Sequence, residues 1–173
     1  MIEVRHLKKS FGSQRILDDV NFRIENGESA VIIGRSGGGK SVLLKHLVGL
    51  LQPDAGDVLV DGENIGPMNE RQLLRVRRKF GFVFQGAALF DSMTVAENVA
   101  FGLRRHENLT EGEIAKRVAA SLEMVELPGT QNQKPAELSG GMKKRVGLAR
   151  AIIYEPQIVL YDEPTTGLDP IVS

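Results

Sequence analysis

The pattern of apolar and polar positions along this chain predicts strands of two kinds. Residues 2–7 and 20–24 alternate between apolar and polar side chains, which is typical of strands with one buried face. Three mainly apolar runs, 29–33, 80–84 and 158–161, are of strand length and too short for helices. We therefore expect short, half-exposed strands early in the chain and buried strands at the three apolar runs.

Helices are predicted between these strands by caps and by apolar stripes. Thr94 and Thr110 are each followed three residues later by a glutamate, which fits the capping box that begins a helix. Residues 114–125 carry one apolar stripe, and 42–51 are apolar around most of a helix. A further helix is predicted from Ser139 to about Tyr154. The alternation of elements predicts an α/β fold with a mixed, mainly parallel core sheet and a helical insertion at about 86–135.

Composition limits the class of protein without naming it. At 173 residues the chain suits one domain, spanning 1–173. Its 22 basic residues balance 22 acidic ones, so no bulk charge indicates a nucleic-acid partner, and none is expected. Cysteine is absent, which excludes disulfides and thiolate metal sites. No stretch approaches the roughly 18 consecutive apolar residues of a membrane span. We expect a cytoplasmic protein that acts at a membrane only through a partner.

The most specific motif is the sequence G-x-x-x-x-G-K-S that follows the apolar run at 29–33. Glycines allow backbone N–H groups to surround phosphate oxygens, Lys40 reaches the β- and γ-phosphates, and the Ser41 hydroxyl holds Mg²⁺. A helix that begins here also directs its positive end at the anion. The alternative is an ordinary flexible turn. The expected nucleotide-binding residues of this loop are Gly34, Arg35, Ser36, Gly37, Gly38, Gly39, Lys40, Ser41 and Val42.

Three later motifs follow this loop in a fixed order along the chain. Gln85 ends an apolar run, Leu138-Ser139-Gly140-Gly141-Met142 opens a helix, and Asp162-Glu163 ends another apolar run. Together with the phosphate loop, this set resembles the nucleotide-binding domain of ABC ATPases over essentially the whole chain. The resemblance implies a P-loop NTPase fold, an ABC ATPase domain with N-terminal antiparallel strands.

The resemblance also implies roles for the residues of these motifs in ATP hydrolysis. Glu163 orients the attacking water as the catalytic residue, with Gln85 and Lys40, while Ser41, Gln85 and Asp162 form the Mg²⁺ site. A solvated loop or a helix N-cap is the alternative for the two carboxylates. Ser139, Gly140 and Gly141 bind the γ-phosphate held by an opposite subunit, which implies a head-to-tail homodimer around two ATP molecules. Phe11 stacks on adenine, or else is a core phenylalanine.

A narrower resemblance concerns the stretch that follows Gln85. The sequence Gly86-Ala87-Ala88-Leu89-Phe90, with Met142 in place of the usual glutamine, is similar to ATPases of Mla/MCE-type lipid transport systems. This resemblance implies a transmembrane permease that docks on that stretch, an MCE-domain lipid-binding partner, and a location on the inner face of the cell membrane. The alternatives are another ABC importer or exporter, or a soluble ABC ATPase that acts on nucleic acid or ribosomes.

One feature of the family is missing from the printed sequence. The switch histidine of ABC ATPases follows the catalytic glutamate after a further helix and strand, whereas ten residues follow Glu163. The three histidines, His6, His46 and His106, all precede the last apolar run, and we expect them to be ordinary surface or packing residues. We therefore expect the chain to be incomplete at its C-terminus, able to bind nucleotide and impaired in turnover.

Overall fold

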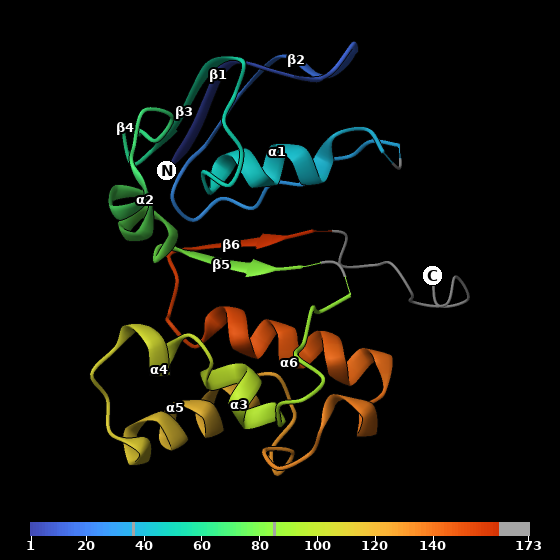
Figure 1. The fold of residues 1–173 in the computed structure, drawn as a ribbon, viewed down its shortest axis with the longest axis vertical. Helices are drawn as coiled ribbons and strands as arrows, with labels where there is room; N and C mark the ends of the chain where they lie inside the picture. The colour runs from blue at the N-terminus through green and yellow to red at the C-terminus, as the bar shows by residue number, and fades with distance from the viewer. Residues whose placement is uncertain (36, 85, 163–173) are drawn as a thin grey trace. The chain divides into compact units, whose positions relative to one another are not determined.

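The computed structural model describes residues 1–35, 37–84 and 86–162, apart from the side chains of residues 105 and 106. The chain folds into two compact units, Met1–Lys79 and Phe80–Ser173, which we call the N-terminal unit and the C-terminal unit. Each unit contains its own sheet (Figure 1). Among the described residues, no helix has the length and apolar character needed to cross a membrane.

An antiparallel sheet forms one layer of the N-terminal unit. Strand β1 (Ile2–Phe11) lies between β2 (Gln14–Ile24) and β3 (Ala55–Val60), and the short β4 (Glu63–Asn64) pairs with β3. The two strands predicted first are confirmed, and both are longer than the alternation indicated. Their pairing continues to Phe11 and Gln14, because a tight turn at Gly12 lets the hairpin close directly beyond them.

Two helices complete the N-terminal unit. Helix α1 (Lys40–Leu47) contacts β3 and buries Leu43, Leu44 and Leu47. Helix α2 (Glu70–Arg77) begins with a capping box at Asn69. Arg77 of α2 donates from its guanidinium to the carbonyls of Val48 and Gly49 just beyond α1, at 3.0 and 2.9 Å. These bonds satisfy carbonyl groups that the end of α1 leaves without helical partners.

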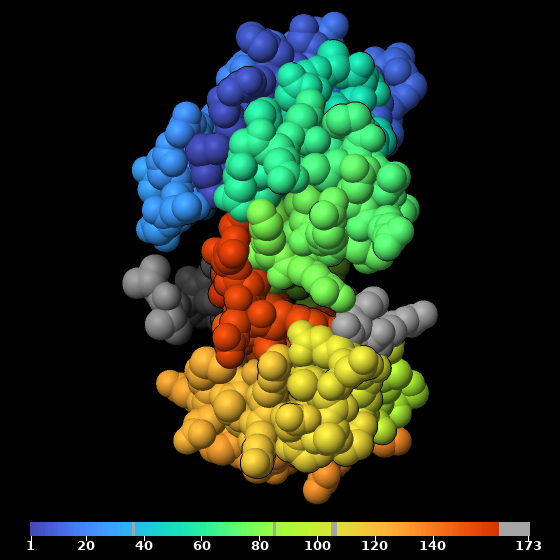
Figure 2. Space-filling model, turned by 90° about the vertical axis from the view of Figure 1, so that its left-hand side faces the viewer, coloured from blue at the N-terminus to red at the C-terminus, as the bar shows by residue number. Residues whose placement is uncertain are grey.

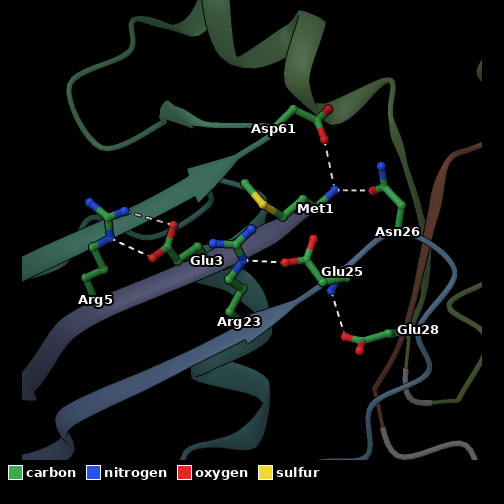
Figure 3. A network of polar contacts seen from close by, with 8 residues as sticks. All are labelled: Met1, Glu3, Arg5, Arg23, Glu25, Asn26, Glu28 and Asp61. Carbon is green, nitrogen blue, oxygen red and sulfur yellow. Dashed lines mark hydrogen bonds and ion pairs between the residues drawn. The ribbon is translucent and has the colours of Figure 1, made fainter.

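Polar contacts at one end of the sheet join β1, β2 and the β3–β4 connection (Figure 3). The α-amino group of Met1 donates to the side chains of Asn26 and Asp61, and Lys79 also pairs with Asp61. Hydrogen bonds from Lys79 and from the α-amino group lower the pKa of the Asp61 carboxyl. The start of β1 is thereby fixed against segments that lie far from it in the sequence.

The C-terminal unit places helices around a parallel strand pair. Strands β5 (Phe80–Val83) and β6 (Ile158–Tyr161) are hydrogen-bonded neighbours in parallel register, although 74 residues of chain, 84–157, separate them. The predicted helical insertion is therefore present between two adjacent strands, and Figure 2 shows much of it as a closely packed group of yellow and orange residues. Within the predicted bounds 86–135 lie α3 (Val95–Ala100), α4 (Leu103–His106) and α5 (Glu111–Met124). The 3₁₀ turn η1 (Pro135–Glu137) begins at the last predicted residue, and the separately predicted helix α6 (Gly140–Ile152) follows it.

The helices of the C-terminal unit share one apolar core. Side chains of α3, α5 and α6, with no more than 5% of their surface exposed, pack against one another; among them are Val95, Val99, Ile114, Leu122 and Val146. The capping boxes predicted at Thr94 and Thr110 are confirmed, since each threonine accepts a hydrogen bond from the third backbone N–H of its helix. Local sequence therefore fixed where these helices begin.

The prediction of a buried strand at 29–33 is wrong for this structure. Residues 28–35 have no regular secondary structure, and Val31 and Ile33 are 84% and 91% exposed. A parallel strand is held only by hydrogen bonds to neighbouring strands. In the N-terminal unit the sheet is β2-β1-β3-β4, and none of these four strands pairs with this segment.

Candidate functional site

The predicted phosphate loop leads directly into α1. Gly39 is the N-cap of the helix and has a φ of 88°, a conformation that glycine adopts without steric cost. The Lys40 ammonium donates to the carbonyls of Gly34 and Arg35, both at 3.0 Å, and Gly38 N–H donates to the Arg35 carbonyl at 3.0 Å. The loop is thus curled around the lysine at the positive end of a helix, which is the arrangement expected of an anion site.

Close packing against β2 holds this loop at its helical end. A Cβ atom added to Gly39 would lie 2.9 Å from Ile16 Cγ2 and 3.1 Å from the Ile16 carbonyl oxygen. Gly39 is buried, whereas Gly37 and Gly38 are exposed. Ser41 and Val42, in the first turn of α1, are partly buried. The loop therefore presents its glycines to solvent while its last glycine is fixed to the sheet, and an ordinary flexible turn does not describe it.

Phe11 lies in the same unit as the phosphate loop, at the end of β1. The side chain is 50% exposed, so the alternative of a core phenylalanine is wrong. The Lys9 ammonium lies 5.6 Å from the centroid of the Phe11 ring. An exposed aromatic ring beside a cation is a surface on which a flat base can stack. Adenine stacking on Phe11 remains a prediction.

Of the second group of predicted residues, Asp162 is described, and it lies at the end of β6. Asp162 directly follows β6, is only 9% exposed, and donates its backbone N–H to the Val83 carbonyl at 3.0 Å. A solvated loop is therefore the wrong description of Asp162. A cavity of about 180 Å³ borders Asp162, Phe84 and Tyr161 together with residues of α6. Carboxylate and hydroxyl oxygens are donors that Mg²⁺ prefers, so Asp162 and Ser41 fit the expected metal chemically.

The third group of predicted residues forms the N-terminus of α6. Ser139 is the N-cap, and its hydroxyl accepts a hydrogen bond from Met142 N–H at 3.2 Å. Gly140 and Gly141 are exposed, and a Cβ atom at Gly140 would meet nothing within 4 Å. The first turn of α6 thus offers backbone N–H groups without side chains in front of them. Such a turn can bind a phosphate oxygen.

The segment that follows Gln85 is held by a buried asparagine that sequence analysis did not single out. Asn98, on α3, is fully buried and accepts a hydrogen bond from Phe90 N–H at 2.8 Å. Its amide group donates to the carbonyls of Phe90, Met93 and Thr94 at 3.0–3.3 Å. A groove of about 410 Å³ next to this segment is lined by Met93, Glu97, Phe101 and Arg104. No local sequence signal identifies Asn98, because all its partners are backbone groups.

The predicted site residues fall into groups within the two units. The N-terminal unit carries Phe11 and the phosphate loop, while the C-terminal unit carries Asp162 at the strand ends and Ser139–Gly141 on α6. Ser36, Gln85 and Glu163 lie outside the described residues. His46, expected to be an ordinary packing or surface residue, is 1% exposed within α1 and its Nδ1 bonds the Val42 carbonyl at 2.8 Å.

Comparison with known proteins identifies the family. The family model described as ABC transporter matches residues 17–166. The chain belongs to this family. The chain is 50% identical over 170 residues to the Probable ribonucleotide transport ATP-binding protein mkl of Mycobacterium leprae, covering 98% of this chain and 49% of the relative. TRIGALACTOSYLDIACYLGLYCEROL 3 of Arabidopsis thaliana is 48% identical, with 100% and 52% covered.

A further relative and a solved structure extend this ABC comparison. The intermembrane phospholipid transport system ATP-binding protein MlaF of Haemophilus influenzae is 43% identical, with 99% of this chain and 65% of the relative covered. The chain thus spans about half to two thirds of the length of these curated relatives. The ATP-binding cassette MJ0796, in a dimeric post-hydrolysis state bound to ADP and Pi, has a TM-score of 0.89. It is 36% identical, and the match covers 98% of this chain and 77% of that one.

Proposed function

We propose that this chain is the ATP-binding and hydrolysing part of a membrane ABC transporter. The single observation that carries the proposal is the phosphate loop, in which Lys40 and a left-handed Gly39 begin α1. Lys40 now donates to two neutral carbonyls, and phosphate oxygens are stronger, charged acceptors for the same ammonium. ATP is therefore the expected substrate, and Mg²⁺ the expected ion.

The proposed mechanism divides the work among the residues of the motifs. In-line attack of water on the γ-phosphoryl group requires a positioned nucleophile and donors to the equatorial oxygens, with little covalent help from the protein. Lys40 and the loop N–H groups bind the phosphates, and Glu163 orients the water and accepts its proton. Ser41, Gln85 and Asp162 would hold Mg²⁺, which when bound neutralises phosphate charge. Ser139 and Gly141 of a second copy would complete the cage, as a head-to-tail homodimer requires.

The cargo we propose is a phospholipid or another hydrophobic molecule of the bacterial envelope. The names of two relatives, MlaF and the Arabidopsis protein, refer to a phospholipid and a glycolipid. A transmembrane permease would dock at the groove lined by Met93, Glu97, Phe101 and Arg104, which lies beside the segment that follows Gln85. An MCE-domain lipid-binding protein is the second proposed partner, and the inner face of the cell membrane is the proposed location.

A different cargo is the second candidate function. The M. leprae relative, at 50% identity, is named for ribonucleotide transport. Since transported molecules contact the permease rather than the ATPase, the residues of the phosphate loop do not distinguish the two cargoes. The discriminating observation is the set of molecules that copurify with the intact complex.

Two experiments test these proposals separately. For the ATPase, Glu163→Gln should retain ATP binding and lose turnover by about a hundredfold or more, while Lys40→Ala should weaken ATP binding roughly 10- to 100-fold. Unchanged turnover in Glu163→Gln would contradict the role of Glu163.

For the cargo, the full-length protein is extracted from native membranes in mild detergent and its partners are identified by mass spectrometry. A permease with an MCE protein and phospholipid supports lipid transport; a permease alone removes the lipid assignment.

A further inference from the structure

The segment directly after Gln85 has an unusual backbone. Gly86, Ala87 and Ala88 are consecutive residues with φ values of 73°, 66° and 46°. Glycine adopts this left-handed region freely, whereas the Cβ of alanine disfavours it. Two neighbouring alanines in this conformation persist only when surrounding contacts determine it. The conformation of this segment therefore depends on the contacts that hold it.

Those contacts come from one face of α6. The Arg150 guanidinium donates from Nη1 to the Ala88 carbonyl at 2.8 Å and from Nη2 to the Ala87 carbonyl at 2.7 Å. The planar fork of arginine matches two acceptors at once. Gly147 lies three residues earlier on the same helical face, and a Cβ there would be 3.1 Å from the Ala87 Cβ. Gly147 thus makes room for the buried Ala87, and Arg150 fixes it.

The cost of this arrangement indicates that it is specific. Burial lowers the pKa of the Arg150 guanidinium, because solvent is removed from a charged group. Its two acceptors in this segment are neutral carbonyls rather than a carboxylate. An apolar side chain would fill the same space without the desolvation cost of a charged group. The half-buried fork is explained by the need to hold two carbonyls in a fixed direction.

The position of Arg150 on α6 connects two parts of the proposed mechanism. Ser139 caps the N-terminus of the helix, and Arg150 lies 11 residues later, about 16 Å along the axis. In Figure 1 the green chain that leaves β5 runs beside α6 before it enters α3. One rigid helix therefore carries the phosphate-facing turn at one end and the grip on the segment after Gln85 toward the other.

We propose that Arg150 is a positioning residue for ATP hydrolysis: it ties the segment after Gln85 to α6, so that this segment and the Ser139 end of the helix move as one body. The proposal rests on the proposed ATPase function, since Gln85 and Ser139 have their roles there. Arg150 touches neither substrate nor metal; it acts through the backbone of Ala87 and Ala88. Movement of a docked permease against this segment would be passed to the Ser139 turn through the same contact.

The test compares Arg150→Met, Arg150→Lys and a control, Arg117→Met, in the full-length protein. Arg117 is a partly exposed cation of α5 that pairs with Glu107, so its loss removes the same charge without touching the segment. Two quantities are measured. Hydrogen exchange of peptides covering 86–94 reports the grip on the segment, and ATP turnover at varied Mg²⁺ reports its consequence, with the Kd for ATP measured in parallel.

Arg150→Met is expected to exchange at least threefold faster over 86–94 and to lose at least tenfold in kcat. It should also need several-fold more Mg²⁺ for half-maximal turnover, while its Kd for ATP changes less than twofold. Arg150→Lys keeps the charge without the fork and should show the same three changes, each smaller than in Arg150→Met. If the methionine variant does not fold, the lysine variant provides the test. Arg117→Met should show none.

Two results would overturn the proposal, and they differ from failure of the ATPase function. Unchanged exchange over 86–94 in both Arg150 variants would show that the segment does not depend on the fork. A parallel fall in kcat and in ATP affinity would show general damage rather than positioning. If the unsubstituted protein does not hydrolyse ATP, the proposed function fails and the role in hydrolysis fails with it. If it does and Arg150→Met keeps its kcat, only the role of Arg150 fails.

Discussion

Two segments of this protein follow apolar runs and use left-handed residues, and they are held in different ways. In the phosphate loop those residues are glycines, Gly37 and Gly39, with φ values of 75° and 88°. In the segment after β5, Gly86 is followed by two alanines in the same region. The loop adopts its shape with little strain, whereas the other segment depends on Asn98 and Arg150. The phosphate loop is thus shaped by glycine backbone and can surround an anion. The segment after Gln85 is shaped by side chains of α3 and α6, which it connects.

The largest expected effect comes from removing the buried amide that holds the segment. Asn98→Ala should lower the free energy of unfolding by about 3 kcal/mol, because backbone groups of Phe90, Met93 and Thr94 lose a fully buried side-chain partner. Denaturant unfolding measures this loss. Asn108→Ala, at an exposed position, is the matched control and should change stability by less than about 0.5 kcal/mol. Equal losses of stability in the two variants would show that Asn98 does not hold the segment after Gln85.

The phosphate loop is tested by adding a single methyl group. Gly39→Ala should cost about 2–3 kcal/mol, since the Cβ brings both a left-handed alanine and contacts of 2.9–3.1 Å with Ile16. Gly37→Ala, which also has a positive φ but open space around its Cβ, should cost about 1–2 kcal/mol. Both stabilities are measured by thermal or denaturant unfolding. A Gly39→Ala variant as stable as Gly37→Ala would mean that β2 does not hold the loop.

Relieving strain in the other segment should give a smaller effect of opposite sign. Ala88 is exposed, with a φ of 46°, so Ala88→Gly removes a steric cost without removing buried surface. The expected gain is up to about 1 kcal/mol, reduced by the greater entropy of glycine in the unfolded chain. Calorimetric unfolding measures it. Destabilisation of more than about 1 kcal/mol would show that the alanine side chain stabilises the segment rather than strains it.

The smallest expected effect is a response to acid that only the second segment shows. Hydrogen bonds from the Thr94 backbone N–H and side chain lower the pKa of the Glu97 carboxyl below its ordinary value. The carboxylate therefore contributes stability above about pH 4.5, and that contribution is lost as pH falls through the lower folded value. NMR titration of the Thr94 amide should follow this loss.

Glu97→Gln is the control for the acid response. Glutamine can keep the capping box without titrating, so the Thr94 amide of this variant should not respond to pH in the same range. The phosphate loop, which is held by glycines and by Lys40, should not respond there in either protein. A titration of the Gly39 amide with the same midpoint as Thr94 would remove this difference between the two segments.

The elements that were predicted correctly are those whose cause lies within a few residues. Thr94, Thr110 and Ser139 cap helices through hydrogen bonds to backbone groups three residues away, so their sequence alone locates the helix starts. The 29–33 strand was mispredicted for the opposite reason. Apolar composition indicates burial, but a parallel strand exists only with paired neighbours, and the strands of the N-terminal unit pair among themselves.

Two of the three residues that sequence analysis missed, Arg150 and Gly147, have partners far away along the chain. Arg150 contacts carbonyls 62 and 63 residues before it, and in sequence it looks like one more cation of a basic helix. Gly147 lies in no turn or cap that requires a glycine, and the reason for it is the close approach of Ala87. Asn98 bonds only backbone groups, which no residue pattern records. Arg150 and Gly147 act by tertiary contact, whereas Asn98 fixes the path of the chain directly before its own helix.

The groups that the proposed chemistry needs could be located from residues close together in the chain: a glycine-rich loop ending in Lys40 and Ser41, a strand followed by Asp162, and a serine-capped helix with two exposed glycines. These features depend on local geometry, which neighbouring residues specify. How the segment after Gln85 is held, and that α6 carries both the Ser139 turn and the Arg150 fork, became visible in the folded chain alone. Gly147, Arg150 and Asn98 act on backbone groups, and the positions of those groups follow from the folded path of the chain and not from the identity of any neighbouring side chain.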